Sequence, residues 1–116
     1  MSVILYGIPN CDTVKKARRW LDAAGIAYRF HDFRKDGLDA DQLQGWIDEL
    51  GWEKLLNKAG TTFRKLPDDV KADLNAAKAL ALMLDQPAMI KRPVLDAKGS
   101  RSVGFSADGW QTRFGD

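Results

Sequence analysis

Cys11 is the residue of this 116-residue chain whose type and position most favour chemistry. It is the only cysteine, and it stands between a short apolar run at residues 3–6 and a segment with helical periodicity that begins at Asp12. A thiol at the start of a helix faces unpaired backbone N–H groups and the positive end of the helix dipole, which both stabilise a thiolate. Such a setting lowers the thiol pKa below its usual value of roughly 8.5 and makes the sulfur a nucleophile.

The neighbours of Cys11 are polar residues and loop formers. Asn10 and Thr13 are able to satisfy N–H groups of the first helical turn, and Lys15 lies one turn further on. The carboxylate of Asp12 opposes a second negative charge beside it. We therefore expect a reactive thiol, and the alternative is a buried, inert cysteine that packs as a small hydrophobic residue.

Two common cysteine motifs fail on spacing. A phosphate-binding C-x5-R loop needs an arginine at position 17, where the chain has Ala17, and Arg18 comes one residue late. A redox C-x-x-C pair needs a second cysteine at position 14, where the chain has Val14. Any disulfide that Cys11 forms must therefore join it to another molecule.

The other residue types that support catalysis are sparse. His31 is the only histidine, and although a histidine is able to act as a base for a thiol, its place on a predicted strand favours a structural role. One histidine and one cysteine do not make a metal site. The tryptophans fall on predicted helical faces, where we expect them to serve the core or an interface: Trp20, Trp46, Trp52 and Trp110.

The pattern around Cys11 predicts a strand, a helix and a second strand. Residues 3–6 are apolar β-formers, and Gly7 and Pro9 bound them. Gly25 fits the left-handed residue just past the end of a helix over residues 12–24. The apolar residues that recur along one face of this helix are Val14, Ala17, Leu21 and Ala24. Residues 26–33 alternate and predict the second strand, which the crossover rule places parallel to the first.

The middle of the chain, residues 39–86, is predicted to be helical, with no strand pattern. Asp39 has the position of an N-cap and Gly51 that of a stop signal for a helix over 39–50. The apolar residues expected on its buried face are Leu43, Trp46, Ile47 and Leu50. The further helical segments that we expect are 52–57, a helix start at 67–69, and 75–84 before Pro87.

The last third returns to strands. Residues 93–96 and 101–105 predict a hairpin around a turn at 97–100. Ser106 or Asp108 is expected to cap a last short helix that runs through residue 114. The order βαβ, helices, ββα indicates an α/β sheet with a helical insertion.

Composition and charge fit one small domain. The chain is 45% hydrophobic and its net charge is +2, which points neither to nucleic acid nor to a membrane surface. The basic cluster Lys15, Lys16, Arg18 and Arg19 is typical of a solvated helix face. No apolar stretch approaches the roughly 20 residues of a membrane span, and the first residues lack the pattern of a signal peptide. With a single cysteine, these features predict a cytoplasmic protein.

The segments YGIPNCDTVKKARRWL and IKRPVL, with the helical block between them, resemble the arsenate reductase-like (ArsC/Spx) family and within it the YffB subgroup. The resemblance covers essentially the whole chain. It implies a thioredoxin-like mixed four-stranded sheet in a single domain, with residues 1–38 and 88–116 as its core and 39–87 as an insertion between the second and third strands. It also implies a cis proline facing the cysteine, at Pro93, and an arginine that contacts an oxyanion or a thiol-bound intermediate, at Arg92.

The chain departs from the glutathione- and glutaredoxin-linked arsenate reductases at two further oxyanion arginines. One lies in an L-L-R-K stretch where this chain has Asn57, and the other aligns with Gly104. Arg64 and Arg101 are close in sequence to these positions but do not match them. The loss of two charge-assisted contacts, at roughly 1.5–3 kcal/mol each, weakens oxyanion binding. The C-x-x-C pair typical of Spx regulators is absent as well.

The residues and the resemblance together predict a glutathione-dependent thiol oxidoreductase with Cys11 and Arg92 as its catalytic residues. The substrate-binding residues that we expect are Asn10, Asp12, Thr13, Lys15 and Pro93. We expect glutathione as co-substrate, glutathione or a glutaredoxin-like thiol donor as resolving partner, and a monomer with no permanently bound cofactor, metal, nucleic acid or membrane partner. Two alternatives stay open: an arsenate reductase, and a non-catalytic, Spx-like regulatory binding protein.

Overall fold

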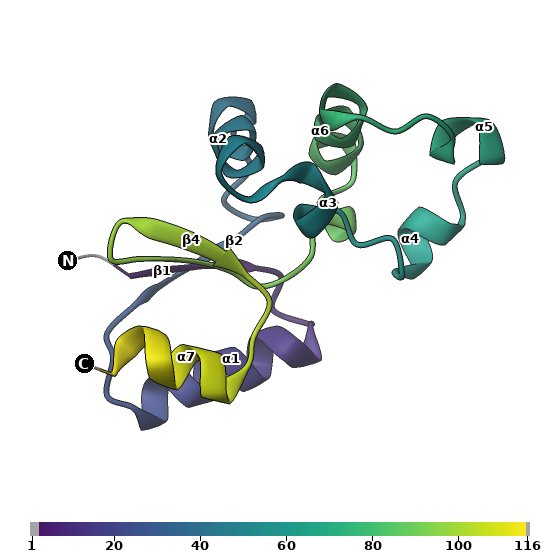
Figure 1. Cartoon of the computed structure of the whole chain (residues 1–116). Helices are drawn as coiled ribbons and strands as arrows, with labels where there is room; N and C mark the ends of the chain where they lie inside the picture. The colour runs from purple at the N-terminus through teal and green to yellow at the C-terminus, as the bar shows by residue number, and fades with distance from the viewer. Residues whose placement is uncertain (1–2, 116) are drawn as a thin grey trace. The chain divides into compact units, whose positions relative to one another are not determined.

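A computed structural model describes residues 3–115 and divides the chain into two compact units (Figure 1). Residues up to Lys35 and from Arg92 onward form the sheet unit, and residues 36–91 form the helical insertion. The sequence predicts these boundaries after residues 38 and 87.

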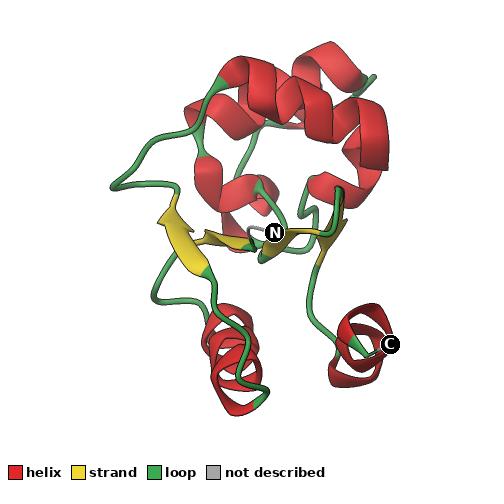
Figure 2. Cartoon of the chain, turned by 90° about the vertical axis from the view of Figure 1, so that its left-hand side faces the viewer, coloured by secondary structure: helices red, strands yellow, loops and turns green. Residues whose placement is uncertain are grey.

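The sheet unit contains four strands in the order β2-β1-β3-β4. Their bounds are Ile4–Gly7 for β1, Arg29–Asp32 for β2, Val94–Ala97 for β3 and Ser100–Val103 for β4. β2 runs parallel to β1, whereas β3 is antiparallel to β1 and β4 is antiparallel to β3. Helices α1 (Asp12–Ala23) and α7 (Ala107–Phe114) cover the same face of the sheet (Figures 1 and 2). This is the mixed four-stranded sheet that the sequence predicts.

The apolar side of α1 fixes this helix to the sheet. Trp20 of α1 meets Trp110 of α7 edge-on, with ring centroids 5.7 Å apart. The buried residues of the core between the sheet and the two helices are Leu5, Ala17, Leu21, Leu95, Ala97 and Trp110. Burial of one such leucine side chain contributes about 1.5–3 kcal/mol. The N-terminus of α1, where Cys11 lies, is therefore held by a packed helix.

The end of α1 explains why the second strand is shorter than predicted. Gly25 has φ +73°, which confirms the prediction of a left-handed residue just past the helix end. The N–H of Ile26 donates to the carbonyl of Leu21 at 3.0 Å and so closes the helix, which leaves this residue outside the strand ladder. β2 accordingly begins only at Arg29. The expectation that Ala24 lies on the buried face is wrong, because it is an exposed C-cap residue.

The helical insertion contains the predicted helices and one that was not predicted. Its elements are α2 (Ala40–Leu50), α3 (Trp52–Leu55), α4 (Thr61–Arg64), α5 (Asp68–Lys71), α6 (Ala76–Asp85) and the 3-10 turn η1 (Pro87–Met89). Asp39 caps α2, as predicted, by accepting a hydrogen bond from the N–H of Gln42 at 3.1 Å. α4 escaped prediction because it is a single turn that begins after Gly60, without a capping side chain or a start signal such as the one at Pro67 before α5. Leu56 and Ile90 also pair in an isolated bridge, where no strand was expected.

The C-terminal hairpin has the predicted form. Lys98 (φ +55°) and Gly99 (φ +79°) make its two-residue turn, in which both central residues have positive φ. β4 ends at Val103, two residues before the predicted end. Of the two candidate caps of the last helix, Ser106 is the N-cap of α7, and its Oγ accepts a hydrogen bond from the N–H of Gly109 at 3.0 Å.

Candidate active site around Cys11

Cys11 is the N-cap residue of α1, directly after the turn that leaves β1. Its backbone is extended, with φ −98° and ψ 125°. Its N–H donates to the carbonyl of Ile8 at 3.3 Å, and its carbonyl accepts the N–H of Lys15 at 2.9 Å as the first bond of the helix. The backbone of Cys11 is thus fixed on both sides, and its side chain is half-buried at the start of α1.

Two opposing effects set the pKa of the Cys11 thiol. Burial is the largest single effect, and it raises the pKa. Hydrogen bonding from the N–H of Val14, from the Arg92 side chain and from the N–H of Thr13, together with the positive charge of Arg92, outweighs it and lowers the pKa below the ordinary value. The donors therefore stabilise mainly the thiolate, which is a stronger acceptor than the thiol.

The sheet brings Arg92 to Cys11 from the far part of the sequence. Val94 of β3 pairs with Tyr6 of β1, so the residues that precede β3 lie at the end of β1 from which the chain turns towards Cys11. The Arg92–Pro93 peptide bond is cis, which confirms the conformation implied at Pro93 by the family resemblance. Pro93 is buried, and its carbonyl accepts the N–H of Gly104 at 2.8 Å. Arg92 is thus anchored next to the sheet.

Gly7 permits the close approach of α1 to β1. A Cβ atom at this position would lie 2.9 Å from Cγ2 of Val14, a distance that real Cβ atoms essentially never show. Val14 is buried and β-branched, so it has little freedom to move aside. Because the N–H of Val14 is a donor to the Cys11 thiol, Gly7 positions the site indirectly. From the sequence, Gly7 was predicted only to bound the first strand.

The residues expected to bind substrate differ in their relation to the thiol. Thr13 acts through its backbone N–H. Asn10, expected as a possible capping residue, lies outside the helix and is exposed, because Cys11 itself occupies the N-cap position. Asp12 and Lys15 are also exposed, and the opposition expected from the Asp12 carboxylate stays a prediction. Their part in substrate binding stays a prediction.

His31 belongs to an aromatic cluster. Its ring centroid lies 4.9 Å from that of Tyr6 and 6.4 Å from that of Phe33, at the end of β2. It does not figure among the groups that shift the pKa of Cys11. The contacts agree with the structural role expected for this histidine.

The other candidate arginines differ from Arg92 in their surroundings. Arg101 faces Asp96 across the hairpin, with Nη1 and Oδ1 3.9 Å apart. Gly104 has φ +86°, a conformation that is strained for a residue with a side chain, so an arginine at this position requires a different backbone. Arg64 has an exposed side chain on α4. Among the described residues, Arg92 is the one arginine whose charge and hydrogen bond act on the thiol.

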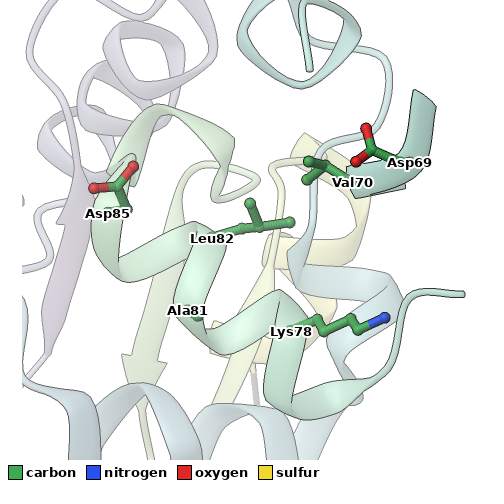
Figure 3. A pocket seen from close by; sticks show the side chains of 6 residues that line it. All are labelled: Asp69, Val70, Lys78, Ala81, Leu82 and Asp85. Carbon is green, nitrogen blue, oxygen red and sulfur yellow. The ribbon is translucent and has the colours of Figure 1, made fainter. Parts of the chain in front are cut away.

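The helical insertion has a hollow of its own, with a volume of about 340 Å³ (Figure 3). Its lining residues come from α5 and α6: Asp69, Val70, Lys78, Ala81, Leu82 and Asp85. It contains neither a thiol nor a histidine, so it offers no second site for thiol chemistry. Within residues 3–115 no three His, Cys, Asp or Glu side chains gather as a metal site requires. No helix in that range is both long and apolar enough to cross a bilayer.

Comparison with known proteins places this geometry in a family. Residues 6–113, which include Cys11, Arg92 and Pro93, match the ArsC family. The chain belongs to the ArsC family. It is similar to the solved structure of a YffB protein, with 54% identity, a TM-score of 0.92 and coverage of 96% of this chain and 97% of that one. The resemblance to this family and to YffB is therefore confirmed.

Other ArsC relatives carry different descriptions. The solution structure of an arsenate reductase (ArsC) related protein from Brucella melitensis is 54% identical, with a TM-score of 0.81, and the match covers 100% of this chain and 97% of that one. The global transcriptional regulator Spx of Streptococcus agalactiae is 27% identical over 91% of this chain and 78% of its own length. A glutaredoxin from Archaeoglobus fulgidus shares the fold alone, at 11% identity and a TM-score of 0.50. The thioredoxin-like fold is thus confirmed, and the ArsC family includes both reductase-like and regulatory relatives.

Proposed function

We propose that this ArsC-family protein is a glutathione-dependent thiol oxidoreductase with Cys11 as its nucleophile. The observation that carries the proposal is the half-buried thiol at the start of α1, whose pKa is lowered by backbone N–H groups and by Arg92. The thiolate is the attacking species in thiol–disulfide exchange, and a site that favours it at neutral pH accelerates the attack.

The proposed reaction has two exchange steps. The Cys11 thiolate attacks the glutathione sulfur of a mixed disulfide between glutathione and a substrate thiol. The sulfur–sulfur bond breaks, the electron pair leaves with the substrate sulfur, and this thiolate takes a proton from water. A second glutathione, as its thiolate, then attacks the glutathione sulfur bound to Cys11 and releases the Cys11 thiolate. One mixed disulfide and one glutathione thus yield one substrate thiol and one oxidised glutathione.

The neighbouring residues have distinct parts in this proposal. Arg92 stabilises the Cys11 thiolate and orients an anionic group of the incoming molecule, such as a glutathione carboxylate, because a guanidinium matches the geometry of a carboxylate. Pro93, whose side chain is buried, shapes the groove that receives an extended, peptide-like thiol. The second thiol comes from outside, since the chain has no other cysteine.

Alkylation kinetics and mass spectrometry test the proposal. We expect one glutathione adduct, on Cys11, to form quickly when the protein is incubated with oxidised glutathione at neutral pH, and none to form on Cys11→Ser. The alkylation rate of Cys11 should rise with pH to a plateau below the pH expected for a free cysteine. A thiol that titrates at or above roughly pH 8.5 and traps no glutathione would refute the proposal.

Arsenate reduction by the same thiol has weaker support. Asn57 and Gly104 stand where the arsenate reductases have arginines, and Arg101 is paired with Asp96. We expect little or no turnover of arsenate in the presence of glutathione and glutaredoxin. Robust turnover in a coupled NADPH assay, lost in Cys11→Ser, would make arsenate the preferred substrate.

A further inference from the structure

The exposed surface of α1 concentrates positive charge next to Cys11. Four of the five residues from Lys15 to Arg19 are basic. One of them, Arg18, has a structural role, because its Nε donates to the hydroxyl of Tyr28 at 3.1 Å and its guanidinium lies 4.4 Å from the ring centroid of Phe30. The basic side chains that are exposed are Lys15, Lys16 and Arg19.

The exposed cations of α1 extend into solvent. Within the described part of the chain, no hydrogen bond or ion pair engages the side chains of Lys15, Lys16 or Arg19. Like charges three and four residues apart on a helix repel one another, and a cation in the first turn opposes the helix dipole. Asp12 and Asp22 stand three or four residues from members of the cluster, but among the described residues no ion pair joins them to it, so the exposed cations are accessible to an anionic partner outside the chain.

The sheet unit as a whole is also positively charged. Residues 1–35 and 92–116 contain eleven Lys and Arg and six Asp, a net charge of +5. The helical insertion contains seven Lys and Arg and ten Asp and Glu, a net charge of −3. The unit that carries the thiol is therefore the one that attracts anions.

Two of the exposed cations follow Cys11 along one side of α1. A step of four residues is slightly more than one helical turn, so Lys15 and Arg19 lie in succession beyond the N-cap. At 1.5 Å per residue, Lys15 is about 6 Å and Arg19 about 12 Å from Cys11 along the helix axis. We call the line formed by Cys11, Lys15 and Arg19 the basic stripe.

The length of the basic stripe indicates the size of its partner. Glutathione is a tripeptide with its sulfur on the middle residue, and an extended chain spans about 3.3–3.6 Å per residue. Counted between Cα positions, the glycine of glutathione therefore lies near the level of Lys15, whereas its glutamate, joined through the side-chain carboxyl, extends further. An acidic residue three or four positions from a cysteine in a longer polypeptide lies about 10–14 Å away and reaches Arg19.

We propose that the basic stripe binds an acidic segment of a protein substrate whose modified cysteine lies three or four residues from the acidic side chains. The proposal rests on the proposed function: the substrate is a glutathionylated protein, and Cys11 removes its glutathione by the exchange described above. Lys15 and Arg19 are then specificity-determining residues, which hold the polypeptide while Cys11 attacks the glutathione sulfur.

Two synthetic peptides test the proposal, each with one glutathionylated cysteine. One has Glu at the third and fourth positions after the cysteine, and the other has Gln at both. The measured quantity is the second-order rate of peptide thiol release by the full-length protein. We expect the acidic peptide to react about tenfold faster at low ionic strength, and the ratio to approach one at about 0.5 M salt, where charges are screened over a few ångströms.

Charge variants locate the effect on the protein. Arg19→Gln and Lys15→Gln should each reduce the ratio of the two rates several-fold. Arg29→Gln is the matched control, because it removes an exposed arginine from the start of β2, which pairs with Ile4 at the end of the sheet away from Cys11. It should leave the ratio unchanged.

Each other outcome overturns a defined part of the reasoning. Failure of both peptides to react would refute the proposed function itself. Equal rates for the two peptides, with Cys11 reactive, would refute the inference and leave the thiol chemistry intact. A ratio that persists at high salt, or that Arg29→Gln reduces as much as Arg19→Gln does, would refute the assignment to the basic stripe.

Discussion

Replacing Arg92 by glutamine separates the electrostatic part of Cys11 activation from the rest of the site. Arg92 lowers the pKa of the thiol through a hydrogen bond and through its charge, whereas burial raises it. Arg92→Gln removes the charge and leaves burial and the two backbone N–H donors in place. The thiol pKa should therefore rise in the variant, and less thiolate should be present at any pH below it.

The size of the effect follows from the contact. A hydrogen bond to a charged group contributes about 1.5–3 kcal/mol, and solvent screening of a half-buried thiol favours the lower end of that range. About 1.4 kcal/mol is a factor of ten in an equilibrium constant. Alkylation of Cys11 by iodoacetamide should thus be about tenfold slower in Arg92→Gln at pH values below both thiol pKa values.

The pH profile distinguishes this electrostatic effect from a change of access. Above both pKa values the two proteins are fully thiolate, so their alkylation rates should converge, with the variant slightly faster because a more basic thiolate is more nucleophilic. Arg92→Lys keeps the charge without the planar fork, so its alkylation rate should lie between those of the wild type and Arg92→Gln. Arg101→Gln is the matched control on the same hairpin, since its guanidinium faces Asp96. A variant that is slower by the same factor at every pH would refute the electrostatic role of Arg92.

Three further predictions concern the frame of the site. Gly7→Ala should lower the free energy of unfolding by about 1–3 kcal/mol in urea and slow alkylation of Cys11, because the new Cβ collides with Val14; a fully stable, fully reactive variant would contradict this. Ser106→Ala should lower the free energy of unfolding by about 0.5–2 kcal/mol, because α7 loses its N-cap, and should leave the pH profile of Cys11 alkylation unchanged. Because folding lowers the pKa of Cys11, the thiolate should add to the free energy of unfolding of the wild type relative to Cys11→Ser. This added stability should reach its full size above roughly pH 8.5, the pKa of an unfolded cysteine, and should disappear as the pH falls through the folded pKa. Urea unfolding of both proteins under reducing conditions measures this difference, and a difference independent of pH would contradict the lowered pKa.

Local patterns account for the parts of the fold that were predicted correctly. The apolar periodicity of residues 12–23 and the glycine at position 25 are sufficient to define α1, and Asp39 and Ser106 mark helix starts through side-chain capping. β2 is shorter than its alternating pattern because the N–H of Ile26 closes the preceding helix. Alternation in sequence does not show whether a backbone group already has another partner.

The site depends on contacts that no local pattern contains. The nearness of Arg92 to Cys11 results from the pairing of β3 with β1, two segments separated by the whole insertion, and the sequence indicated it only through a family resemblance. The contact of Gly7 with Val14 depends on how closely a helix approaches a strand. The pairing of Arg101 with Asp96, by contrast, follows from the register of the hairpin that was predicted around residues 97–100.

Because the chain has a single cysteine, thiol exchange at Cys11 requires a second thiol from a partner molecule. The chain supplies a thiolate stabilised by backbone N–H groups and by Arg92, but no second thiol, so every disulfide of Cys11 is intermolecular. In an enzyme with a C-x-x-C pair, the second cysteine ends a mixed disulfide whether or not the partner is correctly bound. Here the lifetime of the mixed disulfide depends on which external thiol reaches it. Recognition of the incoming molecule must then determine specificity, and the positive charge along α1 is where the chain has the means to provide it.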